Sequence, residues 1–292
     1  MPLAASGELV AEAAAHRSAV AAFNVITLEH LQGVIAAAET VGAPVILQVS
    51  ENAVKYHGGQ LHPLAAAAVS AARRSSVPVA LHLDHVKDRA LLLQAADCGF
   101  GSVMYDAAHL SYERNVEATR EAADWAHANG LWLEAELGEV GGKDGHGPLD
   151  AHAPGARTDP AEARRYVEET GVDALAVAIG SSHAMTSRDA LIDHQLLHRI
   201  RLSLDVPLVL HGSSGVSDVE IRRAVRGGIS KVNIGTALNI AMTGAVRAAL
   251  DAAPQAVDPR GYLAAGRRAV TEVVTALLTT VTTAPEGEAV PL

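Results

Sequence analysis

The sequence has few aromatic residues and a single cysteine. Only two Phe and two Trp occur among 292 residues, so a core has to be built from Ala, Val and Leu. Hydrophobic residues make up 49% of the chain and charged residues 19%, a composition that argues against disorder and provides for a sizeable core. Cys98 has no partner for an internal disulfide, which fits a reducing compartment.

Long apolar runs and basic patches are also missing. No stretch reaches the length of a membrane span. The first residues place Glu8 and Glu12 inside an apolar pattern that indicates an amphipathic helix and not a signal peptide. The formal net charge is −10, and the few Arg pairs fall in helix-like segments, which argues against nucleic acid as a partner. We therefore expect a cytoplasmic protein that binds neither membranes nor nucleic acids.

Short β-branched runs alternate with Ala-rich helical stretches along nearly the whole chain. The helical stretches are amphipathic; residues 28–42, for example, place Leu28, Leu31 and Ile35 on one stripe. The runs between them are continuously apolar, as in strands buried on both faces. The predicted strands are Ala21–Ile26, Pro44–Val49, Pro78–Leu83, Gly101–Tyr105, Leu131–Glu136, Asp173–Ile179, Val206–Leu210 and Ile229–Ile234.

Eight such units predict a (β/α)8 barrel, the TIM-barrel fold. A doubly wound sheet is the alternative, but its first turn would normally carry a Gly-rich fingerprint, and AFNVITLEHL has none. We expect a single domain over residues 1–292, with a C-terminal helix over Tyr262–Thr283 and a polar tail from about 284 to 292. The longest connection, Gly138–Pro160, is of a length that is usually functional in a compact domain.

Polar residues recur where the predicted strands end, and a barrel of this type has its active site at those ends. Three of them are His85, His183 and His211. Each alone is more often a hydrogen-bonded structural residue. Together they offer three imidazole nitrogens and leave a fourth position open, which is the pattern of catalytic zinc. The other positions, in strand order, are Asn24, Ser50, Asp84, Asp106, Glu136 and Asn233.

Carboxylates accompany the three histidines. Asp84 and His85 are neighbours, so both can face one site only if the strand ends there and the chain turns. Asp84 is then placed for proton transfer near a metal, or it anchors His85 or His82. Asp106 and Glu136 are expected either to orient metal ligands or to form an alternative metal site.

Two segments rich in small residues close the seventh and eighth strands. They are HGSSG at His211–Gly215 and SKVNIGT at Ser230–Thr236. Barrels of this class commonly bind phosphate there, through backbone N–H groups and hydroxyls at a helix N-terminus. A metal, a carboxylate and a phosphate site suit deprotonation next to a ketone, and so a phosphorylated ketose. The candidate phosphate donors are Gly212, Ser213, Ser214, Asn233, Gly235 and Thr236.

These motifs resemble those of the class II, zinc-dependent ketose-bisphosphate aldolases of the tagatose-bisphosphate and fructose-bisphosphate type. LHLDH, EAELGEVGG, AIGSSH, VLHGSSG and KVNIGT occur in the family's order, and the similarity runs from Ala22 to Val270. The resemblance implies that His85, His183 and His211 bind Zn²⁺ and that Asp84 gives a proton to the C4 oxygen of the substrate. It also implies substrate and phosphate contacts from Asn24, Ser50, Ala184, Gly212, Ser213, Ser214, Asn233, Ile234, Gly235 and Thr236.

The resemblance has further implications for chemistry and assembly. It implies an aldolase, a carbon–carbon lyase of carbohydrate metabolism that cleaves or forms a ketose phosphate through a dihydroxyacetone-phosphate enediolate. A monovalent cation, Na⁺ or K⁺, is expected beside the zinc. The chain is expected to form a homodimer or homotetramer, for which the apolar face of Val270–Val281 offers a surface.

The chain departs from the family pattern at several positions. Asp144 stands where the family has the Glu that moves the proton at the nucleophilic carbon, and Ala184 stands where a Gly normally follows the sixth-strand His. Val86 replaces a small residue or Cys after HLDH. Two alternatives therefore stay open: a non-catalytic or divergent sugar-phosphate-binding paralogue, and a metal-dependent hydrolase on the same barrel. Against the hydrolase, the first strand has no HxH pair.

Overall fold

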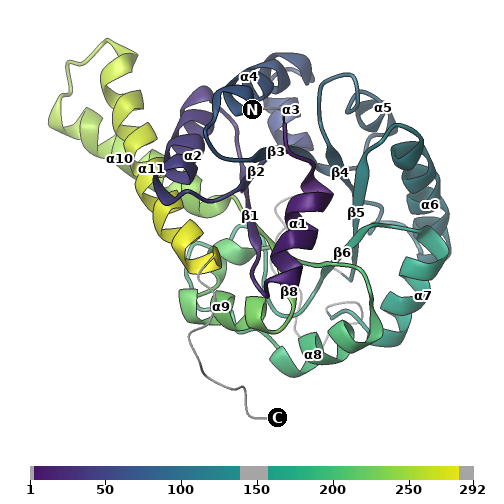
Figure 1. Ribbon diagram of the computed structural model, residues 1–292. Coiled ribbons are helices and arrows are strands. Elements are labelled where there is room, and N and C mark those ends of the chain that lie inside the picture. The colour runs from purple at the N-terminus through teal and green to yellow at the C-terminus, as the bar shows by residue number, and fades with distance from the viewer. Residues whose placement is uncertain (1–2, 139–156, 283–292) are drawn as a thin grey trace.

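Eight parallel strands form a closed barrel in sequence order, surrounded by helices (Figure 1). The computed structural model describes residues 3–138 and 157–282. β1 pairs with both β2 and β8, so the doubly wound alternative is wrong and the (β/α)8 TIM barrel is confirmed. The strands are β1 Val20–Asn24, β2 Val45–Ser50, β3 Val79–Val86, β4 Ser102–Tyr105, β5 Trp132–Leu137, β6 Ala174–Val177, β7 Leu208–Leu210 and β8 Ile229–Ile234.

Local sequence signals begin and end the helices. Asp159 accepts hydrogen bonds from the N–H groups of Ala161 and Glu162, and Pro160 occupies the first helical position of α7. Gly42 ends α2 in the left-handed conformation. The helices are α1 Ser6–Ala15, α2 Leu28–Val41, α3 Glu51–Tyr56, α4 His62–Arg74, α5 Arg89–Leu92, α6 Tyr112–Ala128, α7 Pro160–Thr170, α8 His194–Ser203, α9 Asp218–Arg226, α10 Thr236–Ala252 and α11 Pro259–Thr282, with a 3₁₀ turn η1 at Ser213–Gly215.

Inward-facing side chains fill the barrel in layers, because alternate residues of each strand point inward. At the N-terminal end the layer is apolar and is covered by α1, which lies across the opening (Figure 1). This cluster consists of Leu9, Val10, Ala13, Val20, Ala22, Ile46 and Ala80. The barrel is therefore closed at the end opposite the predicted active site.

The next layer toward the C-terminal end is polar. Gln48, His82, Glu134 and Lys231 are all 0% exposed. Two residues further along the same strands come Ser50, Asp84, Glu136 and Asn233, which form part of the C-terminal rim. Each functional position on these strands thus stands directly above a buried polar residue.

The C-terminal helix packs inside the chain. The predicted helix over Tyr262–Thr283 is observed as α11, and its apolar residues Val270, Val274 and Val281 are buried. α11 packs against α2 and α10. The Val270–Val281 face is therefore covered by its own chain, and its proposed use as a subunit surface is wrong.

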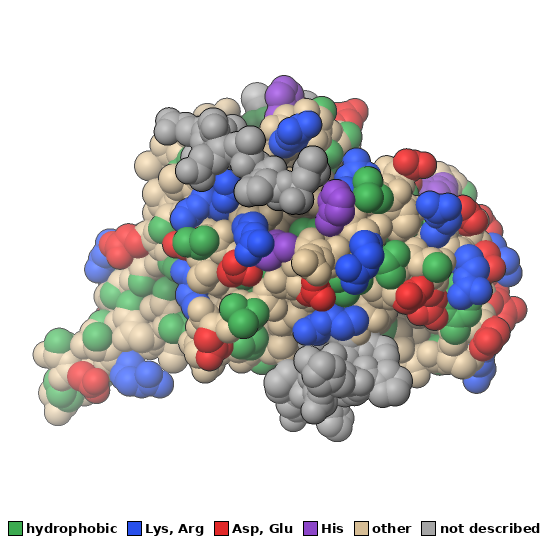
Figure 2. Space-filling model, turned by 90° about the horizontal axis from the view of Figure 1, so that it is seen from below, with side chains coloured by type: hydrophobic (Ala, Val, Ile, Leu, Met, Phe, Trp, Pro, Cys, Tyr) green, Lys and Arg blue, Asp and Glu red, His purple; other side chains and the backbone are tan. Residues whose placement is uncertain are grey.

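The pair formed by α10 and α11 extends beyond the barrel (Figures 1 and 2). Within α10 only Leu238 is buried, whereas Ile240 and Leu250 are exposed. On the face drawn in Figure 2, acidic and basic side chains are interspersed. Within residues 3–138 and 157–282, no helix is both long enough and apolar enough to span a membrane. The single domain stays a prediction, and the polar tail lies outside the described residues.

Gly33 in α2 lies against α11, so a substitution at this position tests how closely the two helices pack. A Cβ at this position would lie 2.8 Å from Val270 Cγ1 and 3.1 Å from the Arg267 carbonyl oxygen. We expect Gly33→Ala to lower the free energy of unfolding by about 1–3 kcal/mol, the usual cost of overpacking. Gly261→Ala near the start of α11 is the control: no described atom lies within 4 Å of its added Cβ, so it should stabilise by about 0.5–1 kcal/mol. Urea denaturation measures both changes, and equal signs would contradict this packing.

Candidate active site

A bulge in β3 lets two neighbouring side chains face one site. The strand does not end after Leu83 as predicted but continues to Val86, and its pairing with β4 shifts register between these two residues. Inside the shift, His85 has a φ of +49°. An extra residue in a strand turns the chain locally, so Asp84 and His85 both line the same cavity. The predicted turn exists, but within the strand.

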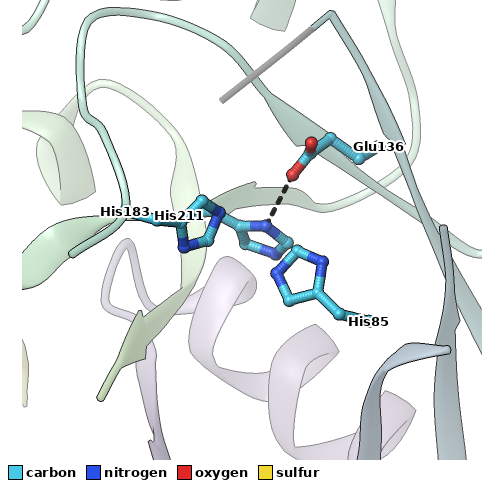
Figure 3. A group of neighbouring side chains, drawn as sticks. All are labelled: His85, Glu136, His183 and His211. Carbon is cyan, nitrogen blue, oxygen red and sulfur yellow. Dashed lines mark hydrogen bonds and ion pairs between the residues drawn. The ribbon is translucent and has the colours of Figure 1, made fainter. Parts of the chain in front are cut away.

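Three histidines and a carboxylate converge at the C-terminal rim. One candidate ligand atom from each of His85, Glu136, His183 and His211 lies within 4.8 Å of all the others. Figure 3 shows the three imidazole rings gathered together, with Glu136 reaching His211 from β5. The ring centroids are 4.9 to 5.7 Å apart. Three nitrogens and one oxygen match the donor set that zinc prefers, so the residues fit this metal.

Carboxylates orient two of these histidines. Asp106 Oδ2 lies 3.1 Å from His85 Nδ1. Glu136 Oε2 lies 2.8 Å from His211 Nδ1, and Glu134 Oε1 lies 2.8 Å from His211 Nε2. Such partners fix the ring orientation of metal-binding histidines. Asp106 therefore lies beside the metal-site group without belonging to it, whereas Glu136 both touches His211 and belongs to it.

His211 is a fully buried imidazole between two carboxylates. Burial lowers its pKa, but the hydrogen bonds to Glu134 and Glu136 outweigh burial and raise the pKa of His211 to about 9. Both ring nitrogens then donate, as in the protonated ring. A metal at this site would take the place of that proton, since a ligand nitrogen has to be deprotonated.

One carboxylate oxygen of Asp84 is buried beside the cavity without a hydrogen-bond partner among the described residues. This oxygen is Oδ1, whereas Oδ2 accepts a hydrogen bond of 2.9 Å from Asn24 Nδ2. Burial raises the pKa of Asp84, but the charges of His85, His82, His211 and Lys231 together hold it below its ordinary value. Asp84 is therefore an ionised carboxylate at neutral pH. In the described part of the chain no hydrogen bond joins it to His85 or His82, the anchoring roles considered above.

A cavity of about 530 Å³ opens beside these groups. Most of the predicted substrate residues line it. Ile234 is the exception: it is 1% exposed and packs in the core outside the barrel, because it alternates with the inward-facing Asn233. The predicted residues at the cavity are Asn24, Ser50, Asp84, His85, His183, Ala184, Gly212, Ser213, Ser214, Asn233, Gly235 and Thr236.

Six cavity residues were missed in the sequence: Ile26, Asn52, Ala53, Tyr56, Ser182 and Asn239. Four of them are in helices that directly follow a strand, three in α3 and Asn239 in α10. A search restricted to strand ends does not find these four; extending it by two helical turns would.

Backbone groups form the anion-binding part of the cavity. Gly212 has a φ of +65°, and a Cβ there would lie 2.6 Å from the Ser182 carbonyl oxygen, so only glycine fits. The turn η1 follows at once, and Ser214 Oγ accepts from the N–H of Ala237 at 3.1 Å. The first turn of α10 has no side-chain cap. Its N–H groups and the helix dipole favour an anion such as phosphate.

Residues 4–285 match the model of the class-II fructose-bisphosphate aldolase family. The chain belongs to this family. It is similar to the YdjI aldolase from Escherichia coli K12, with 34% identity over 98% of this chain and 100% of the other and a TM-score of 0.82. A putative fructose-1,6-biphosphate aldolase from Coccidioides immitis is 30% identical over 95% and 96%, with a TM-score of 0.81.

A fructose-bisphosphate aldolase from Campylobacter jejuni shares the fold, at 24% identity over 96% and 95% of the chains and a TM-score of 0.79. The predicted family is confirmed. The protein is an aldolase, a lyase that acts on sugar phosphates. The non-catalytic and hydrolase alternatives are set aside.

Of two departures from the family pattern, at Asp144 and Ala184, the structure describes only the second. Asp144 lies outside the described residues. Ala184 has a φ of +56°, in the left-handed region where L-residues with a Cβ are disfavoured and glycine is not. The left-handed backbone conformation thus explains why the family has Gly at this position. Ala184 adopts the same conformation at an energetic cost.

The strain at Ala184 predicts the sign of a stability change. We expect Ala184→Gly to raise the free energy of unfolding by about 0.5–1 kcal/mol, because the left-handed penalty exceeds the entropy cost of glycine. Ala36→Gly, at an exposed position inside α2, should lower it by about 0.5–1 kcal/mol. Thermal unfolding of both variants checks this. Destabilisation by Ala184→Gly as large as by Ala36→Gly would show that Ala184 is unstrained.

Proposed function

We propose that this aldolase is zinc-dependent and that it cleaves or forms a ketose phosphate at a dihydroxyacetone-phosphate unit. The observation that supports this is the convergence of His85, His183, His211 and Glu136 within 4.8 Å, beside the cavity that holds Asp84. The three histidines would hold the metal. Zinc, when bound, polarises a ketone oxygen and stabilises the negative charge that develops there.

The neighbouring carboxylates keep the ligands in place. Glu134 holds His211 through Nε2, which leaves Nδ1, beside Glu136, as the nitrogen for a metal. Asp106 holds His85 through Nδ1 in the same way. A metal on Nδ1 would replace the hydrogen bond between Glu136 and His211, so of the two alternatives expected from the sequence Glu136 takes the role of a further oxygen donor to the metal.

Asp84 carries the proton at the C4 oxygen. In cleavage its Oδ1 takes the proton of the C4 hydroxyl while the C3–C4 bond breaks and an aldehyde leaves; in synthesis it returns that proton. The Asn24 amide holds Oδ2 at 2.9 Å, and Oδ1 stays without a partner among the described residues and so is available for this proton. Asp144, by its match to the family's Glu, removes or returns the proton at the nucleophilic carbon.

The phosphate of the triose unit binds at the backbone groups of Gly212, Ser213 and Ser214 and at the first turn of α10, with Gly235 and Thr236. Asn233 and Ser50 also line the cavity. A monovalent cation, Na⁺ or K⁺, accompanies the zinc. The single cysteine suits a cytoplasmic location.

The metal assignment predicts one zinc per chain. Elemental analysis of the purified protein should show this stoichiometry, and a chelator should remove the zinc together with cleavage activity. His183→Ala should lower zinc occupancy by more than about tenfold, since even partners outside the ligand set contribute 10–100-fold to affinity. His62→Ala, at an exposed position in α4, is the control. Full occupancy in His183→Ala would refute the ligand set.

The acid–base assignment predicts that C–C cleavage depends on Asp84 and that C–H exchange depends on Asp144. Asp84→Asn should slow cleavage by about 10²–10⁴, the usual contribution of general acid–base catalysis, while keeping zinc. Exchange of the triose-phosphate C–H in deuterated water should persist in Asp84→Asn and be lost in Asp144→Asn. If Asp84→Asn loses zinc instead, Asp84 supports the metal site. If Asp144→Asn exchanges at the parent rate, another group is the base.

The exposure of the projecting helix α10 is the basis for a proposal about oligomeric state. Because only Leu238 of this 17-residue helix is buried in the chain, we propose that α10 packs against a second copy in a homodimer or homotetramer. Ile240→Glu, at an exposed apolar position, should then lower the mass measured by light scattering at micromolar concentration. Gln32→Glu, exposed on α2, is the control. A monomeric parent would refute the proposal.

A further inference from the structure

Lys231 lies in the centre of the barrel, on β8, and is 0% exposed. An ammonium group carries three donors and no acceptor. All three have acceptors here: Glu134 Oε2 at 2.7 Å, Asn233 Oδ1 at 2.8 Å and Gln48 Oε1 at 2.9 Å. Because Lys231 can only donate, each amide that touches it has to present its oxygen.

That constraint passes along a chain of amides to Asp84. With Oε1 held by Lys231, the Gln48 amide turns Nε2 outward and donates to Asn24 Oδ1 at 3.2 Å. With its oxygen occupied, Asn24 in turn donates from Nδ2 to Asp84 Oδ2 at 2.9 Å. Each amide has one donor end and one acceptor end, so reversing one link would place two oxygens against each other. The chain therefore has one direction, from Lys231 to Asp84.

A second, shorter branch ends in the cavity. Lys231 holds Asn233 by Oδ1, which leaves Asn233 Nδ2 without a hydrogen-bond partner among the described residues. Asn233 is 6% exposed and lines the cavity. The same ammonium group thus fixes the direction of two amide branches, one that ends on the Asp84 carboxylate and one that leaves Asn233 Nδ2 without a partner at the cavity wall.

We propose that Lys231 is a positioning residue of this aldolase: through Gln48 and Asn24 it fixes the direction of a hydrogen-bond chain that holds Asp84 by Oδ2 and leaves Oδ1 without a partner at the cavity wall. It does not itself touch the substrate, since Lys231 is absent from the cavity wall and lies one layer below it. The role of the final carboxylate rests on the proposed function; the direction of the chain does not.

Gln48→Glu tests the chain at its middle link. The variant keeps the shape of the side chain and its acceptor for Lys231, but an ionised Glu has no N–H for Asn24. The Asn24 amide then loses its fixed direction, and a misplacement of the catalytic group of about an ångström costs roughly 10²-fold. We expect cleavage to fall between ten- and a hundredfold, while triose-phosphate C–H exchange and zinc occupancy stay at the parent level.

Ser102→Ala is the matched control. Ser102 belongs to the same buried layer, where it bonds His82 and Ser6, but it is not a link in the chain. It should leave the ratio of cleavage to exchange unchanged. If Gln48→Glu does not fold, Gln48→Met interrupts the same link without adding a charge, and the same result is expected.

A second measurement needs no activity. In protein labelled with ¹⁵N-asparagine, the side-chain NH₂ signal of Asn24, assigned by its absence in Asn24→Ser, should exchange slowly with solvent. It should exchange quickly in Gln48→Glu or Gln48→Met and remain slow in Ser102→Ala. An unchanged Asn24 signal, or an equal fall of cleavage and exchange, would overturn the proposal. A parent enzyme that fails to cleave ketose phosphates but shows the predicted Asn24 signals would instead refute only the proposed function.

Discussion

The ion pair between Lys231 and Glu134 is the interaction on which the site depends. The two groups are 2.7 Å apart and both are fully buried. Two charges inside a barrel lose their hydration, so each needs further polar partners to remain there. Those partners are the residues that hold the groups proposed to be catalytic. Glu134 reaches His211 on one side of the barrel, and Lys231 reaches Gln48 and Asn233 on the other.

The barrel converts this buried pair into a rim of oriented groups. Residues two positions apart on a strand face the same way, so Glu134 stands below Glu136 and Lys231 below Asn233. A polar layer that only filled the barrel would add no specificity. Here Lys231 can only donate hydrogen bonds, and ionised Glu134 can only accept them. These two groups therefore decide which end of each neighbouring side chain points toward the C-terminal rim. The proposed metal ligand His211 and the carboxylate of Asp84 are thus oriented from one source.

Backbone strain is concentrated at the same rim. Among the described residues, positive φ values at non-glycine positions occur at Arg17, His85 and Ala184, and the last two line the cavity. Such conformations cost on the order of 1–3 kcal/mol and persist only where the surrounding structure imposes them. At His85 the strained residue lies in the bulge that brings this side chain and Asp84 to the same cavity.

The sequence predicted the closed barrel and the four groups Asp84, His85, His183 and His211, because strand ends in a parallel barrel converge whatever the details of packing. It did not predict the bulge in β3 or the outward position of Ile234, since a one-residue shift in a strand changes the face of a side chain without changing composition. Lys231 was also missed as a functional residue: a lysine next to a polar rim reads as solvated until the closed sheet shows it buried.

The burial of the Val270–Val281 face by its own chain is a further feature that the sequence did not predict. An apolar helix face has to be buried, but the pattern does not say by what. Here α2 and α10 of the same chain contact it, and the helix that stays largely exposed is α10, although its sequence is at least as apolar as that of α11. Tertiary neighbours far apart in the sequence decide between a core and a subunit surface.

The most direct measurement is a crystal structure of the zinc-loaded protein with a triose-phosphate analogue, with an anomalous map recorded at the zinc edge. A single zinc peak between His85, His183 and His211, with the phosphate at Ser214 and the first turn of α10, is the predicted result. A zinc peak away from these histidines, or a phosphate bound elsewhere on the barrel, would contradict a single metal and phosphate site at this rim.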